Sequence, residues 1–348
     1  AERGGSVVLL AANPLDPLWE GRPAEPLEPV TIQPEAFSGT PARQKIDNIA
    51  EDVKGRKADA VLVTDPSSIA WIFNIRGNDV PHTPHPLARA IIHADGKADL
   101  FVDERKLNGE VKAYLNDLVK RHAPTDIELT LRGLAEKGAS ILVDADVVPV
   151  VLTHVIKDNG GKVIEATDPV KLPRACKNEA ELAGAAAAHV QDGAAMVEYL
   201  AWLDSQQPGT VTEIQAVTKL EQARARLGEA MQNPLKDVSF DTISGSGPNA
   251  AIIHYRVTTD SDRRLQDGEM FLVDSGAQYV NGTTDITRTV AIGNVPEEQK
   301  RFFTLVLKGV IAISDAKFPK GTRGCDLDPL ARIALWKAGA DYGHGTGH

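Results

Sequence analysis

Short apolar runs alternate with amphipathic stretches through the first half of the chain, from about Glu35 to residue 168. The runs are rich in β-branched residues, which favours strands, and the stretches between them suit surface helices. Alternation of this kind predicts an α/β domain with a mixed sheet. The runs expected to form strands are 60–63, 69–73, 90–93, 100–102, 141–143 and 163–165, and 109–122 is amphipathic.

Proline divides the chain at two places. Residues 14–34 are rich in proline and charge, a composition that resists regular structure and indicates a linker. A strand-like run at 7–10 precedes it, so residues 1–34 are expected to be the remnant of a preceding domain plus this linker. Pro169 and Pro173 mark the second boundary, which predicts one domain at 35–168 and another at 169–348.

Helical spacing of apolar residues begins again after the second boundary. Residues 178–203 lack proline and are rich in alanine and leucine, which predicts one long helix. Thr212 and Glu213 suit the capped, acidic first turn of a second helix at 212–227. After residue 240 come expected strands at 242–244, 251–255, 270–274 and 284–292, then expected helices at 296–317 and 327–338.

Composition and charge narrow the classes of function. The chain has 348 residues, 42% of them hydrophobic, which is enough for two domain cores. The sequence has no run of roughly 20 uncharged apolar residues that could span a membrane. It also lacks the charged-then-apolar order of a secretion signal, so a cytoplasmic protein without a membrane partner is expected. The net charge of −10 is spread without a basic stripe, which argues against a nucleic-acid partner. Cys176 and Cys325 are expected to be buried free thiols.

Two aspartates stand where expected strands end or begin. Asp274 closes the run 270–274, where an unpaired charge is costly to bury, and Asp285 comes just before the strand core of the next run. Two facing carboxylates from a hairpin can hold a pair of divalent ions about 3.5–4 Å apart. An isolated pair of this kind is nevertheless more often a structural feature of a turn or strand end.

The expected turn between these aspartates creates a geometric difficulty. Asn281-Gly282 is a standard hairpin turn, and a tight two-residue turn there would set Asp285 opposite Gln278. Asp274 would then lie on the same face but roughly 13 Å away at strand rise. A metal site therefore needs a looser turn, or a bulge that shifts the register towards 279–280.

Three histidines are candidates for chemistry. His344 and His348 alternate with glycines at the end of the chain, where the backbone could approach a ligand closely and neutral imidazole could bind a metal. A flexible glycine-rich tail is the alternative for that segment. His254 ends the expected strand 251–255 and could handle protons, although a lone strand histidine is more often a hydrogen-bonded structural residue.

Together these segments resemble the pita-bread metallopeptidases, and specifically the long, three-domain Xaa-Pro aminopeptidases. The resemblance covers essentially the whole chain, and the segments near Trp19 and Arg76 favour the long form over the shorter prolidases. The matching segments are NPLDPLW at 13–19, IAWIFNIRGNDVP at 69–81, TISGSGP at 242–248, FLVDSGAQY at 271–279 and NGTTDITRT at 281–289.

The resemblance implies a fold and a site. The fold is a creatinase-like N-terminal α/β domain followed by an incomplete pita-bread metallopeptidase domain. Asp274, Asp285 and His348 match three of the family's metal ligands, His254 matches its proton-shuttling histidine, and His344 matches an active-site histidine just before the third ligand. The family's two glutamate ligands are expected beyond residue 348. The chain is therefore expected to be cut at both ends and inactive alone.

The implied activity is hydrolysis of the N-terminal Xaa-Pro peptide bond by a hydroxide held between two divalent ions. Mn²⁺ is the expected metal, because a carboxylate-rich shell suits a hard cation, with Zn²⁺ or Co²⁺ as alternatives. The expected partners are peptides with proline in the second position and a second copy in a homodimer. The alternatives are a non-catalytic pita-bread module that binds a peptide or protein, and a prolidase that cuts Xaa-Pro dipeptides.

Overall fold

A computed structural model describes residues 4, 8, 10 and 13–347 of the chain. The strand expected at 7–10 falls largely outside these described residues. The proline-rich stretch has little regular structure, with one 3₁₀ turn, η1 (Asp16–Leu18), and one short strand at its end, β1 (Thr31–Ile32). Strand β1 pairs with β3 (Ile75–Arg76), so the end of the linker is attached to the first domain.

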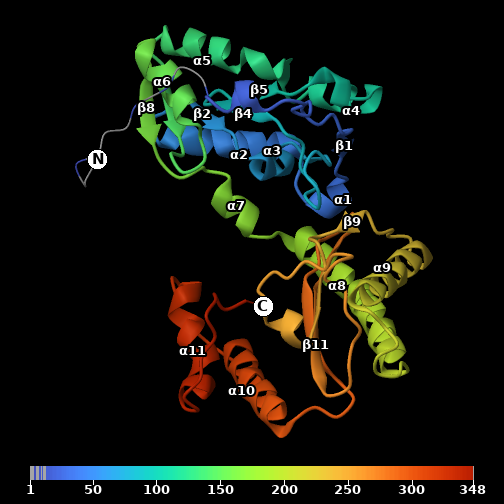
Figure 1. Cartoon of the computed structure of the whole chain (residues 1–348). Coiled ribbons are helices and arrows are strands. Elements are labelled where there is room, and N and C mark those ends of the chain that lie inside the picture. The colour runs from blue at the N-terminus through green and yellow to red at the C-terminus, as the bar shows by residue number, and fades with distance from the viewer. Residues whose placement is uncertain (1–3, 5–7, 9, 11–12, 348) are drawn as a thin grey trace.

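The first domain is a mixed six-stranded sheet between two layers of helices, as predicted (Figure 1). Its strand order is β6-β5-β4-β2-β7-β8, in which β4 is antiparallel to β2 and β5, and the other neighbours are parallel. The strands are β2 (Ala60–Val63), β4 (Arg89–His93), β5 (Ala98–Phe101), β6 (Lys120–His122), β7 (Ser140–Val143) and β8 (Lys162–Glu165).

Alternating side chains of this sheet bury two separate cores. In β2, Val61 and Val63 point towards one layer of helices, while Ala60 and Leu62 point towards the other, as the two-residue period of a strand requires. The first layer comprises α2 (Ala42–Gly55), α3 (Pro66–Ile72) and α4 (Gly109–Asn116), and the second comprises α5 (Ile127–Ala135) and α6 (Val150–Asp158).

The strand expected at 69–73 is wrong, because these residues lie in helix α3 and its C-terminal cap. Asp65 caps the helix by accepting a hydrogen bond from the Ser67 backbone N–H, and Pro66 occupies the first helical position. A short apolar run has the same appearance in a buried helix and in a strand. The Asp-Pro pair before it was the signal that distinguishes the two.

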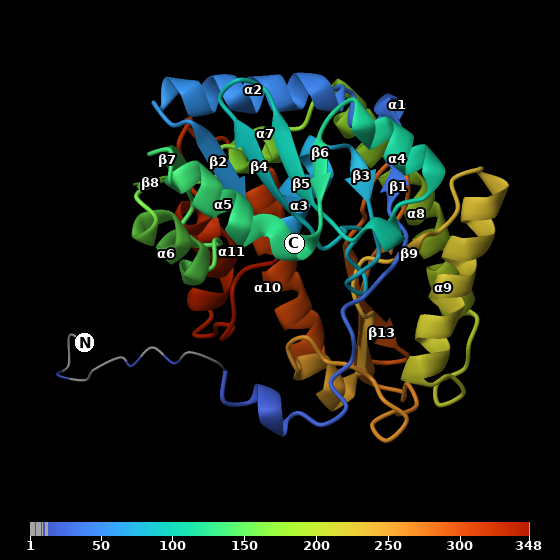
Figure 2. The same ribbon diagram turned by 90° about the horizontal axis from the view of Figure 1, so that it is seen from above.

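Two long helices form one side of the second domain. Helix α7 (Lys171–Ala175) leads from the first domain to α8 (Glu179–Asp204), which packs against α9 (Glu213–Ala230) (Figure 1). Both long helices begin with a capping box, at Asn178 and Thr212, and both confirm the predicted helices. In both whole-chain views, α9 lies on the opposite side of the domain from α10 (Glu297–Ser314) and α11 (Gly324–Trp336) (Figure 2).

A three-stranded antiparallel sheet lies at the centre of the second domain. Its order is β10 (Ile243–Ser246), β11 (Glu269–Ser275) and β13 (Ile286–Ile292). Beyond β11, strand β12 (Ala277–Gln278) pairs instead with β9 (Asp237–Val238). Phe271 and Val273 of β11 pack on Met196 and Tyr199 of α8 and on Leu220 of α9, so one face of this sheet is buried against the two long helices.

The strand expected at 251–255 is also wrong. The chain there forms a 3₁₀ turn, η4 (Gly247–Ala251), followed by a reversal in which His254 has φ = +53°. Contacts distant in sequence fix this shape, because the Asn249 side-chain amide and the Tyr255 hydroxyl both donate to the Glu213 carboxylate, at 3.0 Å each to Oε2. Ile252 and Ile253 are more than half exposed, at 53% and 55%, so this apolar run is not a core strand.

The C-terminal helices pack mainly on each other. Helices α10 and α11 match the expected helices at 296–317 and 327–338. Phe303, Ile311 and Trp336 of these helices remain exposed. Both cysteines are exposed, which corrects the expectation of buried thiols. Cys176 caps the end of α7 in the connection between the domains, and Cys325 lies in the first turn of α11.

Candidate metal centre

The β11–β13 hairpin brings Asp274 and Asp285 to one face of the central sheet. Asp274 pairs with Thr287, and Ser275 pairs with Ile286. The same register continues to the bridge between Gln278 and Thr283, so Asp285 lies opposite Gly276, diagonal to Asp274. Diagonal neighbours are about 7–8 Å apart at Cα, which lets two carboxylates reach ions about 3.5–4 Å apart.

This face is the one turned away from α8 and α9. Phe271, Val273 and Ser275 of β11 are buried on the helix side, so Asp274 projects from the opposite face. Asp274 is half-buried and accepts a hydrogen bond from the Thr287 hydroxyl to Oδ1 at 2.8 Å, while Asp285 is exposed. The sheet therefore offers two carboxylates side by side at a solvent-accessible surface.

The hairpin turn lies one residue earlier than its sequence suggests. The Tyr279 backbone N–H donates to the Gly282 carbonyl at 2.9 Å, so the chain reverses across Val280 and Asn281. The turn predicted at Asn281-Gly282 is therefore wrong. The displacement is towards the register that a metal site needs, because it moves Asp285 from opposite Gln278 to opposite Gly276.

Helix α8 and the first domain hold the turn in this position. A Cβ atom on Gly184 of α8 would lie 2.3 Å from the Asn281 carbonyl oxygen, so the helix backbone and the turn are in direct contact. Gln33 donates from Nε2 to the Val280 carbonyl at 2.8 Å, and Asn233 donates to the Asn281 side chain at 2.8 Å. The register of the hairpin is thus set by tertiary contacts in addition to the turn sequence.

A buried ion pair supports the hairpin from behind. Arg224 of α9 donates to both carboxylate oxygens of Asp192 of α8, at 2.7 and 2.9 Å, and to the Ser275 hydroxyl at 3.0 Å. The Tyr279 hydroxyl also donates to Asp192, and burial together with this carboxylate raises the pKa of Tyr279. Sequence reasoning missed this group, although a charged residue on the apolar face of each long helix was a signal for it.

The predicted histidines lie at separate places. His254 is exposed in the reversal after η4, and His344 is exposed in the segment after α11, where its Nδ1 lies 2.8 Å from the Gly345 carbonyl oxygen. Arg332 of α11 positions that segment by donating to the Tyr342 and His344 carbonyls. His348 lies outside the described residues.

The carboxylate donors of this face suit a hard divalent cation. Carboxylate oxygens are the ligands that such cations prefer, so Asp274 and Asp285 fit part of a dinuclear site in kind and in placement. Within residues 13–347, however, the structure gathers no group of three or more His, Cys, Asp or Glu side chains that could hold a metal ion. The carboxylate pair is the part of the predicted site that the structure places together.

Two family models match consecutive parts of the chain. Residues 21–181 match the creatinase/prolidase N-terminal domain, and residues 183–348 match metallopeptidase family M24. Among curated proteins, the probable Xaa-Pro aminopeptidase P of Paracoccidioides lutzii is 40% identical over 99% of this chain. That of Aspergillus clavatus is 40% identical over 100% of this chain. The chain spans 57% and 53% of the length of these two relatives.

Solved structures show the same fold. The X-prolyl aminopeptidase of Caenorhabditis elegans, described as a cytosolic enzyme with a di-nuclear active site, superposes with a TM-score of 0.89 at 32% identity. The match covers 98% of this chain and 56% of that enzyme. The Xaa-Pro dipeptidase of Bacillus anthracis shares the fold, with a TM-score of 0.68 and 22% identity. The match covers 88% of this chain and 81% of the dipeptidase chain. The chain therefore combines a creatinase-like domain at residues 21–181 with an M24 metallopeptidase domain of pita-bread fold at residues 183–348.

Proposed function

We propose that this chain is part of a metal-dependent aminopeptidase that hydrolyses the N-terminal Xaa-Pro peptide bond. The supporting observation is the pair Asp274 and Asp285, which share one face of the β11–β13 hairpin within the M24 domain. The relatives at 40% identity are Xaa-Pro aminopeptidases, and this chain spans about half of their length. The activity of the whole protein is therefore inferred from that relationship.

Each predicted site residue has a proposed role. Asp274 and Asp285 would hold the cations, with His348 as a third ligand. Two divalent ions supply Lewis-acid polarisation and activate a water for attack on a carbonyl. The Thr287 hydroxyl, by donating to Asp274 Oδ1, fixes the direction in which that carboxylate presents its second oxygen. His254 and His344 would hold or move protons beside the scissile bond, since the ring nitrogens of an imidazole can donate and accept hydrogen bonds.

Further properties belong to the same proposal. Mn²⁺ is the proposed metal on the basis of the carboxylate donors, with Zn²⁺ or Co²⁺ as alternatives. We also propose a cytoplasmic homodimer that acts on peptides with proline in the second position, and a division of the chain at 1–34, 35–168 and 169–348. Among the described residues, the structure has no helix long and apolar enough to cross a membrane.

The metal affinity of the 348-residue chain is expected to be weak. Asp274, Asp285 and His348 would supply three protein ligands, which is too few to fill the shells of two ions. Titration with Mn²⁺, followed by electron paramagnetic resonance, should give weak binding that Asp274→Asn and Asp285→Asn each reduce further. Asp260→Asn changes an exposed loop carboxylate and serves as the control. Equal Mn²⁺ binding by all four proteins would contradict the assignment of the two aspartates.

Activity is tested on the full-length gene product that contains this chain. With Mn²⁺ present, a tripeptide with proline in the second position should be cleaved, and the same peptide with alanine there should not. Asp274→Asn and Asp285→Asn should reduce turnover by more than roughly a hundredfold, since each would disrupt the cation pair. Preference for the Xaa-Pro dipeptide over the tripeptide would identify a prolidase instead. Full activity in both the Asp274→Asn and the Asp285→Asn variant would overturn the proposal.

A further inference from the structure

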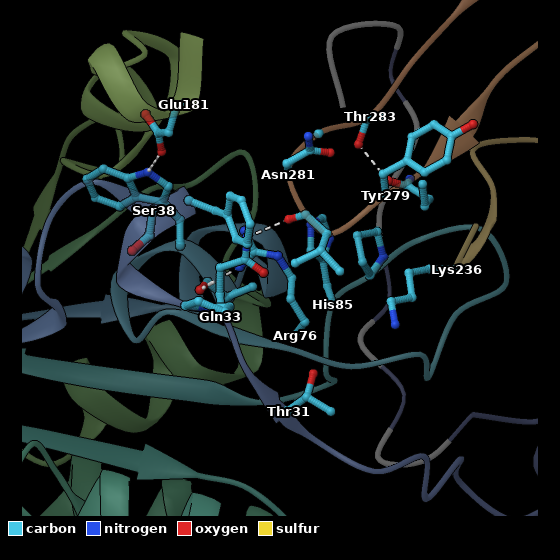
Figure 3. Close-up of a pocket in the computed structure, with 18 of the residues that line it drawn as sticks. Thr31, Gln33, Ser38, Arg76, His85, Glu181, Lys236, Tyr279, Asn281 and Thr283 are labelled. Carbon is cyan, nitrogen blue, oxygen red and sulfur yellow. Dashed lines mark hydrogen bonds between the residues drawn. The ribbon is translucent and has the colours of Figure 1, made fainter. Parts of the chain in front are cut away.

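A large cavity lies between the two domains, at the tip of the β11–β13 hairpin. Its volume is about 910 Å³. The first domain contributes β1, α3 and the loop from Arg76 to His85, and the second contributes the start of α8 and the turn at 279–283. Gln33 crosses from one wall to the other through its hydrogen bond to Val280 (Figure 3). The described residues that line this cavity do not include Asp274, Asp285, His254 or His344.

The charge of the cavity wall is strongly positive. Within the described part of the chain, five cationic side chains line it against one carboxylate, Glu181; the cations are Lys45, Arg76, Arg174, Lys177 and Lys236. Arg174 is compensated by Asp65, with an Nη1–Oδ2 distance of 2.7 Å. For the other four cations, Glu181 is the one carboxylate in the described lining, and it also accepts a hydrogen bond from the Trp71 indole at 3.1 Å. An excess of about three positive charges therefore faces this space.

Arg76 lines the cavity and has guanidinium donors for which the described residues offer no acceptor. Its Nη1 donates to the Ala70 and Ile75 carbonyls, at 3.3 and 2.9 Å, which fixes the guanidinium against the loop. Among the described residues, Nε and Nη2 have no acceptor, and both can donate because a guanidinium carries five N–H groups. A half-buried guanidinium fixed on one side and open on the other can bind an oxyanion in a bidentate manner.

The surroundings of two lining side chains, Lys45 and His85, show that the wall is short of negative charge. Lys45 is buried, and its partners among the described residues are neutral: its ammonium donates to the Trp71 carbonyl at 3.0 Å and to Asn74 Oδ1 at 2.8 Å. Burial lowers its pKa to about 8. Burial and the nearby Arg76 lower the pKa of His85 to about 4, so this imidazole is neutral near pH 7 and adds no further positive charge. Burying cations without a counter-charge costs free energy, which a bound anion would recover.

We propose that this cavity binds a small oxyanion with two or more negative charges, held by Arg76 and by Lys177 and Lys236 at its rim. The ligand chemistry is that of a phosphate or a dicarboxylate. Figure 3 shows Arg76, His85 and Lys236 around the same space, with Asn281 and Thr283 of the hairpin turn opposite them. A bound anion would bridge the two domains, because Lys236 belongs to the second domain and Arg76 to the first. This site is separate from the proposed metal centre and does not depend on the aminopeptidase assignment.

Calorimetric titration of the metal-free chain with inorganic phosphate tests the site. Saturable binding of one phosphate is expected, and Arg76→Gln should weaken it by roughly tenfold or more, since a charge-assisted hydrogen bond is lost. Arg105→Gln is the control, because this exposed arginine pairs with Asp103 outside the cavity. Asp274→Asn should bind phosphate as the unmodified chain does, which separates this site from the metal centre. A parallel titration with succinate tests whether the site prefers a dicarboxylate to a phosphate. The probe that binds more tightly indicates the chemical class of the ligand.

A second set of variants covers the case in which Arg76→Gln does not fold. Lys177 and Lys236 are exposed at the rim, so the double variant Lys177→Gln, Lys236→Gln should fold and should also weaken binding. His85 provides a local readout, because its side-chain NMR resonances should move on phosphate addition. Absence of saturable binding of both probes would overturn the proposal. So would unchanged affinity in the variants, or a site that leaves the His85 resonances unaffected.

Discussion

Gln33 and Val280, 247 residues apart, are joined by a hydrogen bond of 2.8 Å from the Gln33 side-chain amide to the Val280 carbonyl. The bond connects the first domain to the turn of the hairpin that carries Asp274 and Asp285. Gln33 is buried, with 8% of its surface exposed, so the Val280 carbonyl lies where water does not easily replace the amide. The position of the hairpin turn therefore depends on the docking of the two domains.

Replacement of Gln33 by alanine is expected to destabilise this docking. The Val280 carbonyl would lose a buried donor, which corresponds to about 1–3 kcal/mol for an unsatisfied group. Denaturant unfolding of Gln33→Ala should show this loss, and amide hydrogen exchange should become faster in the turn at 279–283. Gln33→Glu keeps the size of the side chain but removes the amide donor, so hydrogen exchange in the turn should again become faster. A variant with unchanged exchange in the turn would contradict this role of the hydrogen bond.

Two glycines of helix α8 should respond oppositely to alanine. At Gly184 a Cβ atom would lie 2.3 Å from the Asn281 carbonyl oxygen, so Gly184→Ala should destabilise by about 1–3 kcal/mol through overpacking. At Gly193 a Cβ atom meets nothing within 4 Å, so Gly193→Ala should stabilise by about 0.5–1 kcal/mol through helix propensity. Thermal unfolding of both variants measures the difference. Equal shifts in the same direction would show that the contact with the turn is unimportant.

The buried pair of Arg224 and Asp192 should be essential for stability. Arg224 is fully buried, so Arg224→Met would leave the Asp192 charge uncompensated and should cost about 3–5 kcal/mol. Arg226→Met, two residues later on the same helix, breaks an exposed pair with Glu198 and should cost about 0.2–1 kcal/mol. Urea unfolding compares them. Combining Arg224→Met with Asp192→Leu should restore part of the loss; a double variant worse than both single variants would refute the explanation by an unpaired charge.

Asp65 should contribute to loss of stability in acid. Burial alone would raise its pKa, but hydrogen bonds from Ser67, Arg174 and Ser68 outweigh burial and lower the pKa to about 2. The folded value is below the unfolded value of about 3.9, so the contribution is complete above about pH 4 and is lost as the pH falls through about 2. The free energy of unfolding of Asp65→Asn should therefore lie below that of the unmodified chain at pH 5, and the gap should narrow towards pH 2. A gap independent of pH would exclude this titration.

Sequence patterns correctly predicted the elements that are determined by interactions between residues near in sequence. The long helices α8 and α9 carry their own capping boxes, so both could be located within a few residues. The mixed sheet followed from alternating runs that are buried on both faces. The helix α3 was misinterpreted because a short apolar run does not distinguish period 3.6 from period 2.

The remaining errors arise from contacts distant along the chain. Residues 251–255 form a turn because Asn249 and Tyr255 bind Glu213, and such a partner cannot be identified from an apolar run. The neighbouring positions of Asp274 and Asp285 could be predicted in outline, but their register could not. Asn281-Gly282 favours a turn at its own position, whereas Gly184 and Gln33 hold the reversal one residue earlier. The anion cavity needs both domains in place before it exists.

The confined turn at 280–281 also limits how this hairpin can change in length. Helix α8 contacts it on one side and Gln33 on another, so an inserted residue would have little space to bulge outwards. An insertion or deletion between Gln278 and Thr283 would instead slide β13 past β11 by one position, and a slide of one residue exchanges the two faces of a strand. Asp285 would then point into the packed interior beside α8. A change in the number of residues in this loop would thus separate the two carboxylates.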